Sequence, residues 1–463
     1  MNNFKTYLSP FSWRYGSDAM RQIWSEENKY KVWREIWTAL AKAQYKAGLL
    51  TKEELEDIEK QKENIDIEQI LENEKETKHD VVAAIKEFSK KAKVGGGKIH
   101  LGATSMDIVD NADALRIKQS FEIIERKIKK LLLIFSEKIE KYADHVCIGY
   151  THLQPAEPTT TGYRLSFYAQ DLLTDYNFLQ FVKIQVKAKG MKGAVGTSAS
   201  YQAVLKEKKL DPTEMEKEVM EELGIDASLI ASQVYTRKYD YLALAVLASI
   251  SSSLGKFAGD LRILQSPSIG EWSEPFGKKQ VGSSAMPFKR NPINAEKISS
   301  LARYISVLPQ VVLENATLSY LERTLDDSAN KRILIPEAFL AVDEILDVAI
   351  RLVEGLVINE KKVAYNLEQF APFAGTETIL IRCVEKEANR QAMHEILRDI
   401  SMKAWADIQE GKPNPMIKLL VENKEIKKYL KEKEIKELLD VTHHVGNAPK
   451  RALELVKIIK KIR

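Results

Sequence analysis

Residues 107–142, DIVDNADALRIKQSFEIIERKIKKLLLIFSEKIEKY, decide the fold class. Apolar side chains recur in this stretch mostly at spacings of three and four, and neither proline nor glycine interrupts it. Such spacing puts the apolar side chains on one face of a helix. The stretch therefore predicts a single helix of roughly ten turns, since one turn takes about 3.6 residues. A stripe of that length cannot bury itself, so the helix requires partner helices.

Three further stretches have the same helical periodicity. They run from about residue 240 to 265, from about 292 to 319 and from about 336 to 357. Proline opens the second of these stretches, at position 292, as helix starts often prefer. Alternating strand patterns are scarce. We predict an all-α protein whose long helices pack as a bundle.

Breaks in the helical patterns predict three domains. A chain of 463 residues is too long for one compact domain, and a glycine-rich segment at residues 94–98 ends the first helical region. We predict an N-terminal helical domain over residues 1–105, a central long-helix bundle over 106–357 and a C-terminal helical domain over 358–463.

Composition is typical of a soluble protein. Seventy basic residues nearly balance 66 acidic ones, for a net charge of +4, and the short lysine clusters are typical of solvated helix faces and do not indicate a nucleic-acid-binding patch. Two cysteines without a Cys-x-x-Cys pair fit a reducing compartment. The N-terminus lacks the apolar stretch of a signal peptide. The most apolar run, residues 241–250, is half the roughly 20 residues that a membrane span needs. We expect a cytoplasmic protein with neither nucleic-acid nor membrane partners, and a buried helix at residues 241–250.

One irregular segment carries several reactive groups. Residues 282–292, GSSAMPFKRNP, stand in a glycine- and proline-rich stretch between two predicted helices. The segment offers two hydroxyls, two cations and an amide on a backbone that glycine and proline can hinge. These groups suit an anionic substrate enclosed by a closing lid. Composition alone would favour a polar surface loop.

The same segment resembles the mobile loop of the fumarase, aspartase and argininosuccinate lyase superfamily, whose pattern is Gly-Ser-Ser-x-Met-Pro-x-Lys-x-Asn-Pro. With Ala285 and Arg290 it is most similar to the adenylosuccinate lyase branch. Five further segments resemble that branch in the same order: residues 12–15, 77–80, 100–107, 151–160 and 322–332. The resemblance extends from about residue 12 to 345, and more weakly to the end.

That resemblance implies a β-elimination of fumarate from a succinylated purine nucleotide. It makes Ser283 the base that takes a proton beside a carboxylate, and His152 the acid that protonates the leaving nitrogen. Histidine exchanges protons near neutrality, because its unperturbed pKa is about 6.5. His79 would assist, and Lys289 would stabilise the carboxylate that gains charge. A serine base needs activation, for instance by nearby cations and backbone N–H groups.

The resemblance also assigns the substrate contacts. A phosphate and two carboxylates call for guanidinium groups and hydroxyls. The expected contacts are Arg14, Tyr15, Lys78, Asp80, Thr104, Ser105, Thr151, Gln233, Asn291, Arg323, Ser328 and Arg332. The family usually has arginine where this chain has Lys78, and lysine keeps the charge but lacks the planar fork.

By the same resemblance we expect a homotetramer whose active sites combine segments from three subunits. It implies neither a metal nor an organic cofactor, because this elimination needs only acid, base and charge stabilisation. Two alternatives stay open. One is argininosuccinate lyase, and the other is a helical scaffold protein without activity.

Overall fold

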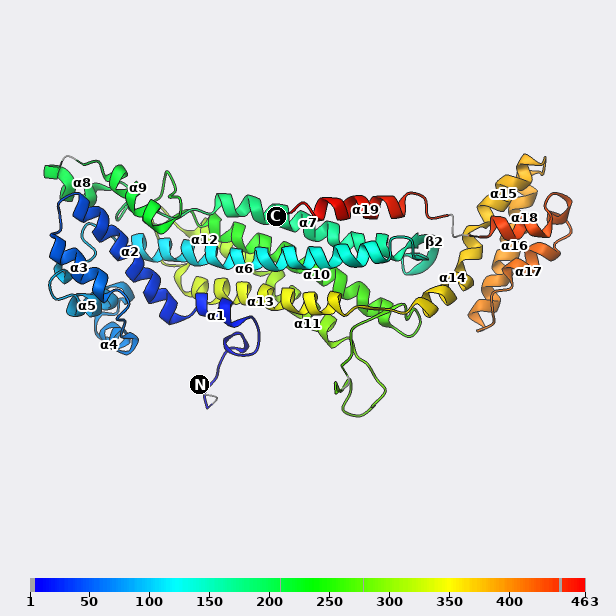
Figure 1. The fold of residues 1–463 in the computed structure, drawn as a ribbon, viewed down its shortest axis with the longest axis horizontal. Coiled ribbons are helices and arrows are strands. Elements are labelled where there is room, and N and C mark those ends of the chain that lie inside the picture. Colours follow the sequence, from blue (N-terminus) through cyan, green and yellow to red (C-terminus); the bar gives the residue numbers. More distant parts are fainter. Residues whose placement is uncertain (1–4, 209, 278, 441–443, 463) are drawn as a thin grey trace. The chain divides into compact units, whose positions relative to one another are not determined.

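The structure is a computed structural model that describes residues 5–208, 210–277, 279–440 and 444–462. Helices make up most of these residues, and the strands are few and short (Figure 1). The prediction of an all-α protein is confirmed.

Contacts within the chain divide it into two compact units. The first unit comprises residues 1–127, 175–252 and 300–347, and the second comprises residues 128–174, 253–299 and 348–463. The three-domain division, with boundaries near residues 105 and 357, stays a prediction.

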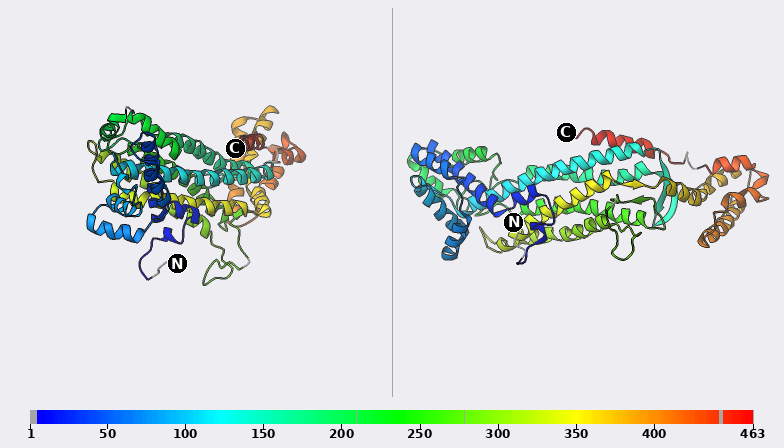
Figure 2. Two further views of the ribbon diagram at one scale, coloured as in Figure 1. Left: turned by 60° about the vertical axis from the view of Figure 1, so that its left-hand side comes forward. Right: turned by 60° about the horizontal axis from the view of Figure 1, so that its bottom comes forward.

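Five helices contribute residues to both units, and segments of α6, α10 and α13 run side by side within each unit (Figures 1 and 2). The five are α6 (Ser105–Lys141), α7 (Thr161–Gln185), α10 (Lys238–Gln265), α11 (Ile293–Ser306) and α13 (Ser328–Glu354).

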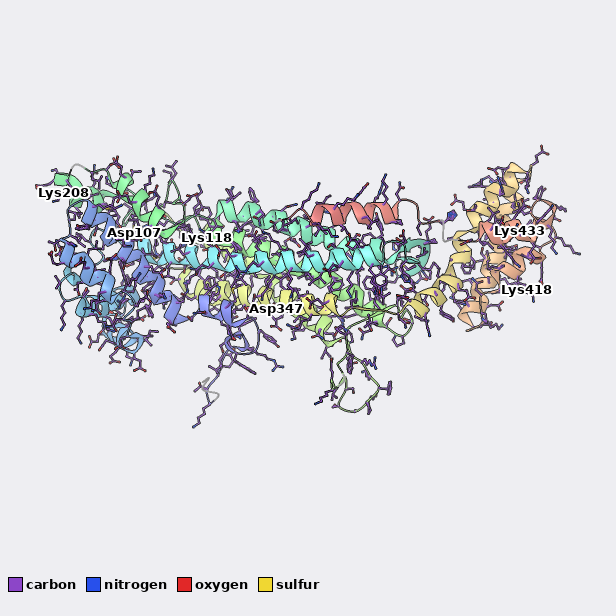
Figure 3. The ribbon with its side chains drawn as sticks, viewed as in Figure 1. Asp107, Lys118, Lys208, Asp347, Lys418 and Lys433 are labelled. Atoms are coloured by element: carbon purple, nitrogen blue, oxygen red, sulfur yellow. The ribbon has the colours of Figure 1, made fainter. Side chains whose placement is uncertain are left out.

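Helix α6 confirms the single long helix predicted at residues 107–142, and Figure 3 labels Asp107 near its start. Its apolar face is buried as the periodicity requires. In the first unit Phe121 meets Phe339 of α13 edge-to-face, with ring centroids 5.3 Å apart. In the second unit Phe135 meets Phe257 of α10 at 5.5 Å. Such aromatic pairs add to the stabilisation from burial.

Two predicted helix bounds are wrong, and both errors involve proline. The pattern from residue 292 to 319 forms two helices, α11 and α12 (Leu308–Leu318), separated at Val307. Pro309 has no N–H to donate and its ring crowds the preceding turn, so one continuous helix is disfavoured there. In contrast, α13 starts at Ser328 and contains Pro336 in its interior. The predicted start near residue 336 is therefore wrong.

The first unit also contains shorter helices whose ends carry recognisable caps. Thr51 and Glu54 form a capping box at the start of α3, and Gly224 closes α9 with a φ of 65°. These shorter elements are η1 (Pro10–Ser12), α1 (Asp18–Ile23), α2 (Glu26–Lys46), α3 (Lys52–Gln61), α4 (Ile67–Thr77), α5 (Asp80–Lys91), η2 (Gly96–Lys98), α8 (Ala199–Leu205), η3 (Lys206–Lys208), α9 (Pro212–Leu223) and α12.

The second unit contains the strands and the C-terminal helices. Its elements are β1 (Val146–Thr151), β2 (Gln154–Thr160), β3 (Trp272–Ser273), β4 (Val357–Ile358), α14 (Glu360–Ala374), α15 (Thr376–Glu385), α16 (Arg390–Gln409), α17 (Met416–Glu422), η4 (Ile426–Lys428), α18 (Glu432–Leu438) and α19 (Ala448–Ile459). Helices α15 to α18 share a small apolar core of their own.

A β-hairpin that the sequence did not predict lies in the second unit. Strands β1 and β2 pair antiparallel, with Val146 opposite Thr160 and Thr151 opposite Gln154. Two prolines in β2 hide the strand pattern, because proline cannot donate to a ladder. The hairpin leaves only His152 and Leu153 for its turn.

Helix α10 contains the most apolar run of the chain. Leu244, Leu247 and Ile250 are fully buried, so the predicted buried helix at residues 241–250 is confirmed. Among the described residues α10 is also the one helix long and apolar enough to cross a membrane, with a mean hydropathy of 1.4 over its most apolar window. Half of that window is buried inside the protein, as in the core helix of a bundle.

Candidate active site

A cavity of about 810 Å³ in the first unit gathers residues from segments far apart in the sequence. The segments come from the α4–α5 turn, the start of α6, the loop before α10 and the loop that leads into α13. Nine predicted site residues line it: Lys78, His79, Asp80, Thr104, Ser105, Gln233, Arg323, Ser328 and Arg332.

The turn between α4 and α5 positions the first three of these residues. Lys78 ends α4 in the left-handed conformation, with a φ of 52°, and its N–H donates to the Glu74 carbonyl at 2.8 Å. His79 follows as the residue before α5, and its Nε2 lies 3.5 Å from the hydroxyl of Ser105. The sharp reversal at Lys78 therefore directs the imidazole toward the start of α6.

Asp80 and Arg332 bring two distant segments together. Arg332 Nη2 donates to the Asp80 carboxylate at 2.8 Å, although 65% of the Arg332 side chain is exposed. An ion pair this exposed contributes little to stability. Its geometry instead directs a guanidinium along the edge of the cavity.

The start of α6 supplies a hydroxyl pair to the cavity. The Thr104 N–H donates to the Asp107 carboxylate at 3.0 Å, which fixes the turn before the helix. Thr104 and Ser105 thus stand at the N-terminal end of a long helix, where free N–H groups and the helix dipole favour anions.

Arg323 presents an unsatisfied donor. Its side chain is only 15% exposed, and Nη1 is buried without a hydrogen-bond partner in the described part of the chain. The Asp327 carboxylate is 4.0 Å from Nη2. Burial lowers the pKa of this guanidinium. A buried cation with a spare N–H beside a cavity is suited to an anionic ligand.

Several residues of the cavity wall were missed by the sequence analysis. They come from α2 and α6, from the residue before α10 and from the start of α13, where helical periodicity gives no sign of a site. Lys29, for example, lies over the Tyr30 ring at 4.3 Å. The missed residues include Lys29, Tyr30, Trp33, Asp110, Asp113, Arg116, Arg237, Asp327 and Lys331.

Arg14 and Tyr15 belong to the first unit but do not line this cavity. Their N–H groups donate to the Pro10 carbonyl at 2.7 Å and 3.1 Å, which forms a tight turn after η1. The next residue, Gly16, donates its N–H to the carboxylate of Glu344 on α13 at 3.2 Å. The Arg14 side chain is exposed.

Thr151 and His152 lie in the second unit, at the β1–β2 turn. His152 and Leu153 have φ values of 53° and 61°. Two-residue turns of type I′ require positive φ at both positions and usually contain asparagine or glycine there. Two larger residues in this conformation indicate backbone strain, which often accompanies function. The turn exposes the imidazole of His152.

The loop before α11, also in the second unit, contains Ser283, Lys289 and Asn291. The Ser283 hydroxyl oxygen accepts N–H groups from Ala285 at 3.3 Å and Met286 at 3.1 Å. Asn291 Nδ2 donates to the Gly282 carbonyl at 2.8 Å and closes the loop. Lys289 is exposed. Figure 1 shows this loop projecting away from α10 and α11.

Gly282 is required where the loop closes on itself. A Cβ there would lie 2.0 Å from the Lys289 carbonyl oxygen. The two ends of the segment can therefore approach closely only with glycine at this position.

The described residues contain no metal-binding cluster. Among the described residues no group of three histidine, cysteine, aspartate or glutamate side chains is placed to hold a metal ion. The expectation that neither metal nor organic cofactor takes part stays a prediction.

Two family descriptions match the chain. Residues 13–306 match the family described as "Lyase", and residues 372–453 match "Adenylosuccinate lyase C-terminus". The chain is 38% identical over 460 residues to the adenylosuccinate lyase of Methanocaldococcus jannaschii, which covers 98% of this chain and 97% of the relative. It is 36% identical over 463 residues to the adenylosuccinate lyase of Saccharomyces cerevisiae, covering 99% and 95%.

Solved structures share the fold at low identity. A fumarate lyase from Mesorhizobium sp. BNC1 has a TM-score of 0.83 at 22% identity, covering 98% of this chain and 99% of that one. A 3-carboxy-cis,cis-muconate lactonizing enzyme from Pseudomonas putida has a TM-score of 0.84 at 23% identity, covering 97% and 99%. These likenesses establish the fold, which is that of the fumarate lyases.

Proposed function

The chain belongs to the adenylosuccinate lyase family, and we propose that it eliminates fumarate from adenylosuccinate to give AMP, as a C–N lyase of purine biosynthesis. We propose the same elimination from the succinylated imidazole carboxamide ribotide. One observation carries the site assignment: nine predicted site residues from distant segments line a single cavity.

The groups that line the cavity are suited to binding an anion. Arg323 brings a buried N–H without a partner, Arg332 a guanidinium directed by Asp80, and Ser328 a hydroxyl at the start of α13. This combination suits the phosphate of a ribotide. Thr104 and Ser105, at the start of α6, suit a carboxylate of the succinyl group. Lys78 adds positive charge, without the bidentate geometry of arginine.

Proton abstraction is assigned to Ser283. Its oxygen accepts two backbone N–H bonds, which favour the anionic form of the hydroxyl as the proton is lost. Once the hydroxyl has released its own proton to solvent, the Ser283 alkoxide would take the proton from the carbon beside a carboxylate, and the electrons of that C–H bond would move into the carboxylate. Lys289 and Asn291 would stabilise the charge that develops there.

Protonation of the leaving nitrogen is assigned to His152. The strained hairpin turn exposes its imidazole, and a histidine can donate a proton near neutral pH. With the C–N bond broken, the products are fumarate and AMP. His79, whose Nε2 lies 3.5 Å from the Ser105 hydroxyl, would orient the succinyl-binding groups.

Self-association as a homotetramer with shared sites is part of the proposal. Three large apolar side chains follow α12 in the first unit and are strongly exposed: Tyr320 at 59%, Leu321 at 92% and Leu325 at 69%. Tyr320 and Leu321 are adjacent in sequence, and neighbouring exposed apolar side chains favour an interaction surface here, while Leu325 also lines the cavity. We place the enzyme in the cytoplasm, acting without cofactor and without nucleic-acid or membrane partners.

A spectrophotometric assay tests the reaction. Purified protein is mixed with adenylosuccinate, and the ultraviolet change is followed as AMP and fumarate form. Turnover by the wild-type chain would support the proposal. Cleavage of argininosuccinate instead would assign the chain to the sister branch, and turnover of neither by the folded protein would favour a non-enzymatic scaffold.

A further inference from the structure

Three charged side chains form a buried cluster beside the cavity. Arg237 Nη1 donates to both carboxylate oxygens of Asp110, at 2.9 Å and 3.0 Å. Arg237 Nε lies 2.6 Å from Asp327 Oδ2, as an ion pair rather than an aligned hydrogen bond. All three side chains are at most 5% exposed, and all three line the cavity. We call this cluster the aspartate–arginine clamp.

The clamp joins the two loops that contribute Gln233 and Arg323. Asp110, on α6, also accepts the N–H of Tyr235 at 2.9 Å, which fixes the loop before α10. The Gln233 N–H donates to the Glu322 carbonyl at 3.2 Å, so the two loops also touch through their backbones. Asp327 lies in the second loop, 4.0 Å from Arg323 Nη2.

Stability alone does not account for such a cluster. Burying charged groups costs desolvation free energy that their mutual attraction often does not offset. Well-packed apolar residues in their place often give a fold that is equally stable or more stable. Burial raises the pKa of Asp110, while the Arg237 guanidinium opposes that shift. Perturbed, ion-paired charges beside a cavity are common where a protein must hold ligand-binding groups in place.

We propose that Asp110, Arg237 and Asp327 are positioning residues that set the direction of Gln233 and Arg323 for the nucleotide. Gln233 and Arg323 touch the ligand, and the clamp acts through them. This inference rests on the proposed function, because the ligand is the AMP moiety shared by substrate and product. The reacting groups Ser283 and His152 lie in the second unit, so the clamp governs binding more than chemistry.

The chain offers a matched control. Arg34 and Glu87 form an ion pair of equal burial in the same unit, with side chains 2% and 1% exposed. Neither residue lines the cavity. Loss of this pair should destabilise the fold without altering nucleotide affinity.

The test uses a double variant, Asp110→Asn with Arg237→Gln, which removes both charges of the bidentate pair and takes the Arg237 partner away from Asp327, whose carboxylate keeps Arg323 Nη2 at 4.0 Å. Asp327→Asn and the control Glu87→Gln are studied beside it. For each full-length protein we would measure the thermal midpoint, the AMP dissociation constant by calorimetry, and KM and kcat for adenylosuccinate. We expect the clamp variants to raise the AMP dissociation constant and KM at least about tenfold and to change kcat less than about threefold. Glu87→Gln should lower the thermal midpoint but leave both constants unchanged.

Two results would overturn the inference separately. If the folded double variant binds AMP as the wild type does, the clamp is structural only, while the proposed function stands. If the double variant fails to fold, the test uses Asp327→Asn instead. An AMP dissociation constant equal to that of the wild type in this variant would also contradict the inference. If the wild-type chain itself neither binds AMP nor cleaves adenylosuccinate, the proposed function fails and takes this inference with it.

Discussion

At the scale of single residues, Ser283 poses the hardest chemical problem, because a serine hydroxyl is a weak base near neutral pH. The loop solves part of this problem, since two backbone N–H groups point at the Ser283 oxygen. Hydrogen bonds of this kind favour a developing negative charge, as in an oxyanion hole. Ser284 has the same side chain in the same loop, and it is exposed.

The neighbouring serines allow a matched test. Ser283→Ala should lower kcat by roughly a thousandfold, within the range for loss of a general base, and should leave KM within about threefold. Ser284→Ala should change kcat less than about tenfold. Steady-state kinetics on both variants would check this. A larger loss at Ser284 than at Ser283 would move the base to the second hydroxyl.

His100 predicts a pH effect on stability. Its Nδ1 accepts the indole N–H of Trp37 at 3.0 Å, and burial lowers the pKa of His100 to about 4. Between that value and the ordinary value of about 6.5, the unfolded chain binds a proton that the folded chain does not. Stability should therefore fall as pH drops through this window, by about 3 kcal/mol in total for this group.

A variant isolates the histidine. His100→Asn keeps an acceptor for Trp37 and tolerates the positive φ of 68° at this position. Denaturant unfolding at pH 7 and pH 4.5 should show a smaller acid-induced loss in the variant than in the wild type. Equal losses in both proteins would exclude His100 as the source.

Single residues also mark where sequence reasoning stopped. Gln233 and Arg332 were predicted because they sit in recognisable motifs, and both line the cavity. Lys29 and Arg116 line it too but were missed. Each lies on a helix whose charged face resembles any solvated surface, and only tertiary packing distinguishes that face from a cavity wall.

At the scale of elements, the hairpin of β1 and β2 holds His152 at a cost. Both turn residues have positive φ, and a non-glycine residue loses roughly 1–2 kcal/mol in that conformation. The neighbouring Leu153 is 64% exposed, so its side chain gains little from burial. The cost is consistent with a turn retained for the placement of the imidazole.

Replacing Leu153 with glycine should relieve part of this strain. Leu153→Gly should stabilise the protein by about 0.5–1 kcal/mol, since glycine adopts positive φ freely but loses more entropy on folding. Leu453→Gly, at an exposed position inside α19, should instead destabilise it by about 1 kcal/mol. Thermal unfolding compares the two, and destabilisation by Leu153→Gly would contradict the strain.

Some helices and strands could be predicted from the sequence and others could not. Long uninterrupted stripes predicted α6 and the buried part of α10, because a 3.6-residue period sustained over many turns fits a helix and does not fit a strand. Proline misled in both directions, since Pro309 divides α11 from α12 whereas α13 accommodates Pro336. The sequence analysis did not predict the hairpin, because two prolines interrupt the strand pattern of β2.

At the scale of the whole molecule, the predicted site is divided between two units. Nine predicted site residues line the cavity of the first unit, whereas His152, Ser283 and Lys289 lie in the second. The sequence order of motifs predicted the list of residues but not this partition, which depends on packing between distant segments. Subunits that share active sites would join the two sets of groups in one tetramer.

Subunit mixing tests this central claim most directly. His79→Asn disables a group of the first unit, and Ser283→Ala one of the second, so each variant alone should be nearly inactive. When equal amounts are dissociated and reassembled together, we expect about a quarter of wild-type turnover of adenylosuccinate, because one site in four receives both intact groups under random mixing. Each variant reassembled alone serves as the control. Hybrid tetramers, verified by mass, with no more activity than the separate variants would contradict shared active sites.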